Sequence, residues 1–516
     1  MAERIRWRVR VEWGGEVFED PDARVDLDED VDITADAGGY QPRRLRIRID
    51  LGDAWARQRD YHWRLARVAV WREPGAHIVS TAPAQAMQPG REGELSEIEV
   101  SERLLEDQSL IPPSFEAEVT YFDQAATAEA TARAIAEAQE EQQEWLQGRP
   151  FVVPAIIDEG SVLVDPVIAT RVIGATYPWV FGRPGESTGE PSSPAYLIDS
   201  GKVLIAGHRC RVGTVTLFGP DGSGGTASAS RPIVHEQDAS GRTVAVATFS
   251  SSADGIESDA NARYFAAWDG TAEGLPGDAA DVVAYLVGLC AGINLDRDSL
   301  LSLRGALTPY YLSGVVEREV SAYDLLVGEV LPLLPVAPIP SATGMRFVLR
   351  QWAAAQPSYH LTEGDGFARL GRWDYDSDRG EGPTTAWSLG YATSSTSRDG
   401  ALVAIASARE RGESIRAQAV YGRRDQQRQT GWVHRPATAD RIVYDWLQRS
   451  AIQRASAEYL VDPYLYGPGG DAELRPGMIV RIADADFDID GLAQVTGYRW
   501  SRGELRFRLL LLEGLP

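Results

Sequence analysis

The sequence predicts an α+β protein that is mostly β, made of several small β domains with inserted helices. Two observations indicate this class. Segments in which apolar and polar residues alternate with a period of two recur along the chain, for example at residues 5–13 and 44–51. Such alternation is typical of sheets with one buried and one solvated face. Other segments show apolar residues at helical spacing and are separated from the strands by turns rich in Gly and Pro.

Residues 1–123 are expected to form an N-terminal β domain, and its strands include residues 63–71 and 116–122. The composition then changes. Residues 124–147 contain no Gly or Pro and are dominated by Ala, Glu and Gln, which are strong helix formers. We therefore assign residues 124–150 to a helical insertion or linker. A contact between copies in a trimer is the alternative, although the apolar residues are mostly Ala and make a thin seam for a coiled coil.

Two more segments fill the middle of the chain. Residues 151–270 are expected to be a second β domain, interrupted by the Gly/Ser-rich turn at 219–225. Residues 271–345 are expected to hold a pair of helices with a strand at 310–316 between them. The first helix follows Asp278 as a cap and the second follows Ser321. Their expected buried residues are Val282, Val283, Leu286 and Leu289 in the first, and Leu325, Leu326, Val330 and Leu331 in the second.

The C-terminal third is predicted to contain a β-rich segment, residues 346–440, and then a helix with a last β domain, residues 441–516. The helix is expected over 440–459, capped by Asp440. A compact meander follows, in which Gly491 and Gly503 are expected at tight turns. The residues expected on its buried face are Val480, Ile482, Val495, Tyr498, Phe507 and Leu509.

Charge limits the partners of this chain. The formal net charge is −24, whereas a nucleic-acid binder needs a basic face to displace counterions. The charge instead suits a channel through which DNA slides without sticking. Nearly every basic residue is Arg, with Lys202 the one lysine. The sequence shows neither a signal peptide at its start nor an apolar run long enough to span a membrane, so we expect a product made in the cytoplasm.

Catalytic and metal-binding patterns are sparse. The six histidines are scattered and no nucleophile motif accompanies them, so no catalytic residue and no cofactor is assigned. His208 lies near Cys210, which fits either a reactive pair or, more simply, a strand residue beside a buried thiol. Residues 486–491 match the opening of a calcium loop and make Asp486, Asp488 and Asp490 calcium candidates. The twelfth position holds Gly497 in place of the bidentate Glu, and the alternative is a solvated turn.

Three stretches show a pattern that occurs together in one protein family. The first is Gly-Ala-Thr-Tyr-Pro-Trp-Val-Phe-Gly at 174–182, followed by Pro-Ala-Tyr-Leu-Ile-Asp at 194–199. The second is Gly-Asp-Ala-Ala-Asp-Val-Val-Ala-Tyr-Leu at 277–286, with Ser-Ala-Tyr-Asp-Leu-Leu at 321–326. The third is Leu-Arg-Pro-Gly-Met-Ile-Val-Arg-Ile-Ala-Asp at 474–484. In this order they resemble the hub proteins of siphophage tail tips, a family that also occurs in gene transfer agent tails and is related to contractile-phage baseplate hubs and type VI secretion spikes.

The resemblance implies a structural, non-enzymatic virion protein at the distal tail tip. Hubs of this family carry tube-like β domains, so three copies of a chain with two such domains present six to a sixfold tail tube. The implied partners are two further copies, the distal tail protein ring, the tape measure protein, and the central fibre or tip proteins. The alternative is a cell-wall hydrolase or carbohydrate-binding protein carried on the tip, for which the 14 Trp residues offer stacking surfaces.

Overall fold

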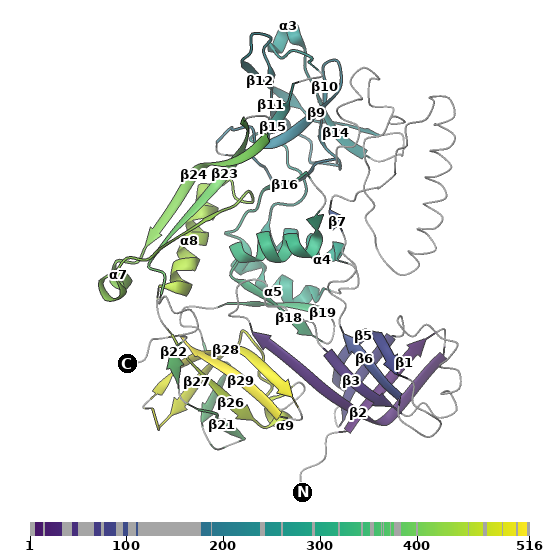
Figure 1. Ribbon diagram of the computed structural model, residues 1–516, viewed down its shortest axis with the longest axis vertical. Coiled ribbons are helices and arrows are strands. Elements are labelled where there is room, and N and C mark those ends of the chain that lie inside the picture. The colour runs from purple at the N-terminus through teal and green to yellow at the C-terminus, as the bar shows by residue number, and fades with distance from the viewer. Residues whose placement is uncertain are drawn as a thin grey trace.

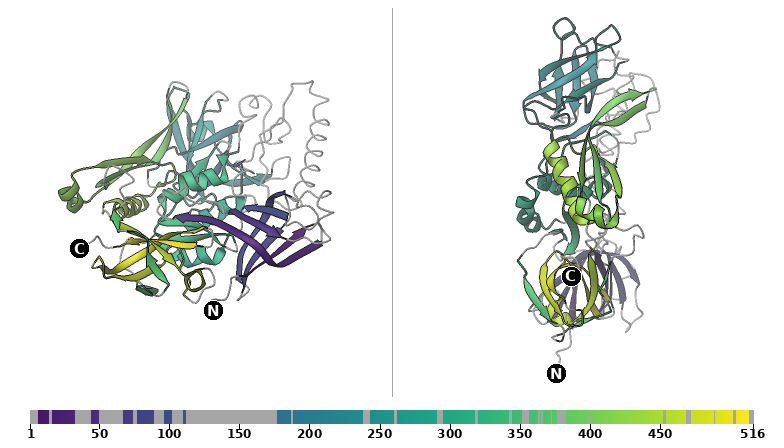
Figure 2. Two further views of the ribbon diagram at one scale, coloured as in Figure 1. Left: turned by 60° about the horizontal axis from the view of Figure 1, so that its bottom comes forward. Right: turned by 90° about the vertical axis from the view of Figure 1, so that its left-hand side faces the viewer.

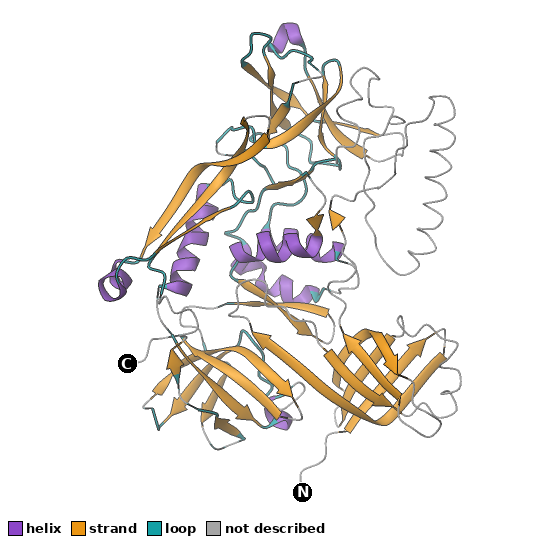
Figure 3. Cartoon of the chain, in the orientation of Figure 1, coloured by secondary structure: helices purple, strands orange, loops and turns teal. Residues whose placement is uncertain are grey.

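A computed structural model describes the chain in segments that extend from residue 6 to residue 512. The described residues are 6–13, 16–32, 44–49, 67–73, 77–88, 96–101, 110–111, 177–186, 188–237, 243–259, 262–290, 295–317, 320–341, 344–350, 356–362, 364, 366–371, 373–375, 383–398, 401–451, 454–467, 472–487, 489–501 and 504–512. The strand expected over 116–122 and the helix expected over 124–147 lie outside them. Within them strands predominate, as Figure 3 shows, and this confirms a mostly β protein of the α+β class.

The described residues of the N-terminal β domain, as we call it from here on, form six strands. They are β1 (Arg6–Trp13), β2 (Glu16–Asp32), β3 (Arg44–Ile49), β4 (Arg67–Glu73), β5 (His77–Gln88) and β6 (Ser96–Ser101). Their pairings run in the order β1-β4-β5-β6-β3-β2 and return to β1, which leaves no free edge along this path. Val9, Val11 and Val70 are buried whereas Arg8 and Arg10 are half-buried, so the period-two prediction for β1 is confirmed.

The C-terminal β domain combines the predicted meander with four further strands. The meander strands are β27 (Ile479–Asp484), β28 (Ile489–Ser501) and β29 (Glu504–Leu511), and the further ones are β20 (Tyr359–Thr362), β21 (Phe367–Arg369), β22 (Asp374–Tyr375) and β26 (Ala455–Val461). The expected inward residues are buried, apart from Tyr498, which is half-buried. Phe367 stacks on Tyr459 with 4.3 Å between ring centroids and joins β21 to β26.

Two expectations for this region were wrong. The helix α8 spans Pro436–Ser450, so Asp440 lies inside it and is not its cap. It begins early because Pro436 takes the first helical position, where its missing N–H costs nothing. It also ends early, because residues 455–461 alternate between buried and half-buried and form β26. Gly491 lies within β28 and not at a turn, because the turn between β27 and β28 comes earlier, at 485–487.

A seven-stranded sheet forms the opposite end of the molecule (Figure 1). Its order is β12-β11-β15-β9-β10-β14-β13. The strands are β9 (Ser193–Asp199), β10 (Lys202–Ala206), β11 (Thr214–Pro220), β12 (Thr226–Pro232), β13 (Val234–Gln237), β14 (Thr243–Thr248) and β15 (Tyr264–Ala267), and the short helix α3 (Ser251–Asp254) adjoins them. The predicted turn at 219–225 connects β11 and β12, where the Asp221 carboxylate accepts the backbone N–H groups of Ser223 and Gly225.

Helices lie between the two ends (Figure 1). They are α4 (Ala279–Leu289), α5 (Arg297–Leu307) and α6 (Ala322–Asp324), which continues as a π-helical turn, Leu325–Val330. Short strands flank them: β7 (Leu110–Ile111) pairs with β17 (Val320–Ser321), β8 (Trp179–Phe181) with β16 (Gly314–Val316), and β18 (Val336–Ser341) with β19 (Gly344–Leu349). The predicted cap at Ser321 is confirmed, because its hydroxyl accepts the Asp324 N–H. No helix in the described part of the chain is long and apolar enough to cross a membrane.

A projection, which we call the arm, extends from one side of the molecule. It consists of β23 (Ala386–Arg398), β24 (Ala401–Glu413), the helix α7 (Ile415–Tyr421) and β25 (Asp425–Gln429). α8 packs along β23 and β24. The packing is close at Gly412 of β24, which lies opposite the side chains of Val443 and Leu447 on α8. Figures 1 and 2 both place α7 at the outer edge of the molecule.

Candidate assembly interface

The two terminal β domains are joined directly to each other. The last residues of β2 pair antiparallel with β28, in the register Glu29 to Trp500, Val31 to Tyr498 and Asp32 to Gly497. Val31 is 4% exposed and packs with Ala337 and Ile339 of β18. β2 is 17 residues long, and Figure 1 shows it reaching from the N-terminal β domain to the C-terminal one. The two domains therefore lie side by side at one end of the molecule.

One buried carboxylate connects three strands of the C-terminal β domain. Asp484, at the end of β27, is 2% exposed. It accepts hydrogen bonds from Trp373 Nε1 at 3.0 Å and from the Tyr459 hydroxyl at 3.2 Å. The Arg369 guanidinium lies 3.0 Å away and neutralises the charge. Burial and this carboxylate raise the pKa of Tyr459, so its phenol stays protonated as a donor. We interpret these contacts of Asp484 as a structural network that stabilises the packing of β21, β26 and β27.

The calcium candidates do not converge in the described residues. Asp486 lies 3.0 Å from Arg369 and is exposed. Asp490 accepts two hydrogen bonds from Arg481, at 2.7 and 2.8 Å, and this pairing lowers its pKa. Asp488 lies outside the described residues. Two of the three carboxylates are thus turned toward different arginines, and no group of three or more metal-binding side chains occurs among the residues that the structure describes. Calcium binding by this loop stays a prediction.

The side chains of His208 and Cys210 lie against backbone groups, and their contacts indicate a structural role. The His208 Nε2 atom accepts the Val180 N–H at 3.0 Å, and Nδ1 lies 3.1 Å from the Arg209 carbonyl oxygen. Burial lowers the pKa of His208 to about 4 and raises the pKa of the Cys210 thiol to about 12. A neutral imidazole with both nitrogens engaged beside a protonated thiol is poorly suited to nucleophilic or metal chemistry. The simpler interpretation of this pair fits the geometry.

α8 anchors the arm to the helical middle of the molecule through a polar group. The Tyr310 hydroxyl donates a hydrogen bond to the Asp445 carboxylate. Burial raises the pKa of Asp445 to about 7. Arg441 lies 3.2 Å from the carboxylate and opposes this rise, but its side chain is half exposed and solvent screens the interaction.

The burial of Asp445 makes stability pH-dependent. Its folded pKa lies above its ordinary value of 3.8, so the folded state keeps a proton that the unfolded state has lost. The stabilisation is complete below pH 4 and is lost as the pH rises through about 7, on the order of 4 kcal/mol in all. We expect Asp445→Asn to flatten the fall in melting temperature between pH 5 and pH 8. Asp440→Asn, at an exposed position of the same helix, should leave the slope unchanged; equal slopes in the wild type and Asp445→Asn would contradict the assignment.

Comparison with known proteins finds likenesses among solved structures. No family model matches the chain, and no curated protein matches it. The tail protein from Neisseria meningitidis MC58 aligns over 98% of this chain and 96% of its own, with 11% identity and a TM-score of 0.37. The prophage MuSo2 43 kDa tail protein from Shewanella oneidensis covers the same shares, with 10% identity and a TM-score of 0.36. The prophage tail protein gp18 from Listeria monocytogenes EGD-e aligns over 63% of this chain and 88% of its own, with 12% identity and a TM-score of 0.25.

Proposed function

We propose that this protein is a structural hub of a bacteriophage tail tip. Three copies form a ring that closes the distal end of the tail tube and connects it to the tip or central fibre. The observation that carries this proposal is the junction of β2 with β28, which sets two β domains side by side in one chain. A trimer then presents six β domains in a ring, and this number suits a sixfold tube on one side and a threefold tip on the other.

The charge supports a place around a DNA channel. The chain carries 75 acidic residues against 51 basic ones. A ring of such subunits repels the DNA backbone, so DNA passes without specific binding. In this position the ring adjoins the distal tail protein and the tape measure protein above it and the fibre or tip proteins below it. The role requires no cofactor and no catalysis.

Cryo-electron microscopy of the particle tests the proposal. Three copies are expected at the distal end of the tube, with both β domains of each copy in one ring. One copy, six copies or absence from the particle contradicts it. Clearing of host peptidoglycan by the pure protein, followed on a zymogram, would instead support the hydrolase alternative.

Val31→Asn tests whether the junction is needed. The change removes apolar burial of about 1.5–3 kcal/mol and leaves an amide without partners, for about 1–3 kcal/mol more. We expect the two β domains to separate, so that limited proteolysis cuts between them and tail tips fail to form. Val17→Asn on the same strand is the matched control, because Val17 is 50% exposed and its replacement should cost under about 0.5 kcal/mol. Normal tips with Val31→Asn would show that the junction is dispensable.

A further inference from the structure

The helix α7 exposes apolar side chains on several sides. Ile415 is 82% exposed, Val420 is 69% exposed and Tyr421 is 36% exposed. Ala417 is the one buried residue of this seven-residue helix. Positions 415, 420 and 421 point in different directions around a helix with 3.6 residues per turn. An apolar helix end of this kind is suited to insertion into a complementary surface and not to packing on its own chain.

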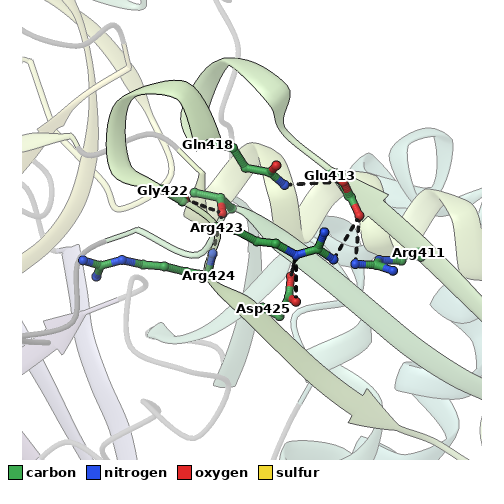
Figure 4. Close-up of polar contacts among 8 residues, drawn as sticks. Arg411, Glu413, Gln418, Gly422, Arg423, Arg424 and Asp425 are labelled. Atoms are coloured by element: carbon green, nitrogen blue, oxygen red, sulfur yellow. Dashed lines mark hydrogen bonds and ion pairs between the residues drawn. The ribbon is translucent and has the colours of Figure 1, made fainter.

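Polar contacts fix α7 to the end of the arm (Figure 4). The Thr385 hydroxyl donates to the Gly422 carbonyl oxygen at 3.0 Å and accepts the Arg424 N–H at 2.8 Å. The Ser414 hydroxyl caps the first turn by accepting the Ala417 N–H. These bonds tie both ends of the helix to the start of β23 and the end of β24.

A second set of contacts orients the charged side chains nearby. Glu413 pairs with Arg411 at 2.9 Å and with Arg423 at 3.3 Å, and Figure 4 shows both guanidinium groups turned toward it. Arg423 also pairs with Asp425 at 3.0 Å. The base of the arm is held as well, because Arg428 donates to the Gly328 carbonyl oxygen in the π-helical turn. The exposed apolar residues therefore stand on a preorganised support, which lowers the entropy cost of docking.

The charge of this region is opposite to that of the chain. Residues 409–428 contain six arginines and three carboxylates, in a chain of net charge −24. The side chains of Arg416 and Arg424 form no ion pair within the described part of the chain, and both residues are exposed. A basic, apolar helix end is thus electrostatically complementary to the acidic surface of an identical chain.

We propose that α7 docks on an acidic face of a second copy of this chain. Ile415 and Val420 pack against apolar side chains of that face, and Arg416 and Arg424 pair with its carboxylates. This inference rests on the proposed trimeric role and names the contact that holds neighbouring copies together. Nucleic acid is a poorer occupant, because it offers no apolar surface for Ile415 and Val420, and two of the nearby guanidinium groups already share Glu413.

Photocrosslinking of the full chain tests the proposal. p-Benzoylphenylalanine replaces Ile415, and the purified protein is irradiated and then separated on a denaturing gel. We expect bands at two and three times the mass of the chain, with peptides around residue 415 linked to an acidic segment of another copy. The same group in place of Leu301, which is 60% exposed on α5, is the matched control and should give several-fold less product. Arg416→Glu with Arg424→Glu, or a rise to high salt, should lower the yield at position 415 several-fold.

The outcomes separate this inference from the proposed function. Crosslinks between copies with the protein absent from particles leave the α7 contact standing and overturn the hub assignment. Particles that contain the protein but link position 415 to a different virion protein or to DNA retain the hub and overturn the α7 contact. A yield no higher than at Leu301, or one that the charge reversal leaves unchanged, also overturns it.

Discussion

Val480→Asp is expected to unfold the C-terminal β domain and, under the proposed function, to prevent tail assembly. Val480 is fully buried in β27, between Tyr359 of β20 and Ala493 of β28. The substitution loses about 1.5–3 kcal/mol of apolar burial and places an unpaired charge in the core, which costs several kcal/mol more after relaxation. A domain is held together by about 5–15 kcal/mol in all. Urea unfolding of the purified chain measures the loss, and electron microscopy shows whether tails form.

A control at a neighbouring position separates burial from a general effect on the strand. Ala483→Asn changes an exposed residue of β27 and should cost under about 0.5 kcal/mol. We expect normal tails from this variant and failed tail assembly from Val480→Asp. Particles with an intact tip that fail to adsorb would show that β27 faces the host receptor, and the structural assignment of this segment would be wrong.

Local patterns in the sequence predicted much of the secondary structure. The period-two alternation identified β1, β3 and β29, because each strand has one face on a core. Apolar spacing identified α4, where Val282, Val283 and Leu286 are buried as expected. Each of these elements has one buried side and one solvated side. This contrast produces a clear periodic pattern of apolar residues over a few positions of the sequence.

Other features have no local signal. α5 was missed because most of its residues are exposed or half-buried, with Leu300 and Leu307 the buried apolar ones, and α7 because a seven-residue helix among arginines shows no periodicity. The pairing of β2 with β28 joins residues more than 460 positions apart, and no pattern within either strand specifies its partner. The helix expected to reach residue 459 was too long because Ala455 and Ala457 fit a helix as well as a strand.

At the candidate interface, too, some features could be predicted from local sequence and others could not. Asp484 ends the third stretch of the family resemblance, yet its partners come from 25 to 115 residues earlier in the chain, so the sequence did not indicate its role. Two of the aspartates that the sequence did single out, Asp486 and Asp490, instead form exposed ion pairs with Arg369 and Arg481. A run of carboxylates in the sequence indicates that each negative charge must be either solvated or paired with a cation. Which of the two occurs at a given carboxylate depends on the fold.

Asp484→Ala is expected to cost about 3–5 kcal/mol, because it removes the buried carboxylate that balances the charge of Arg369. Arg369 has only 10% of its side chain exposed, and Trp373 Nε1 and the Tyr459 hydroxyl lose their acceptor at the same time. Urea unfolding measures the change in free energy. Near-ultraviolet circular dichroism should report the loss of order around Trp373 at urea concentrations where the wild type is folded.

Asp486→Ala is a closely matched control for this change. Asp486 pairs with the same arginine at the same distance of 3.0 Å, but its side chain is 71% exposed. Solvent screens an exposed pair, so the expected cost is about 0–1 kcal/mol. Asp484→Asn should lie between the two, because its amide oxygen still accepts a hydrogen bond while the charge that balances Arg369 is lost. Equal losses for Asp484→Ala and Asp486→Ala would mean that Arg369 moves into solvent when its buried partner is removed, and that the Asp484 network is not what connects β21, β26 and β27.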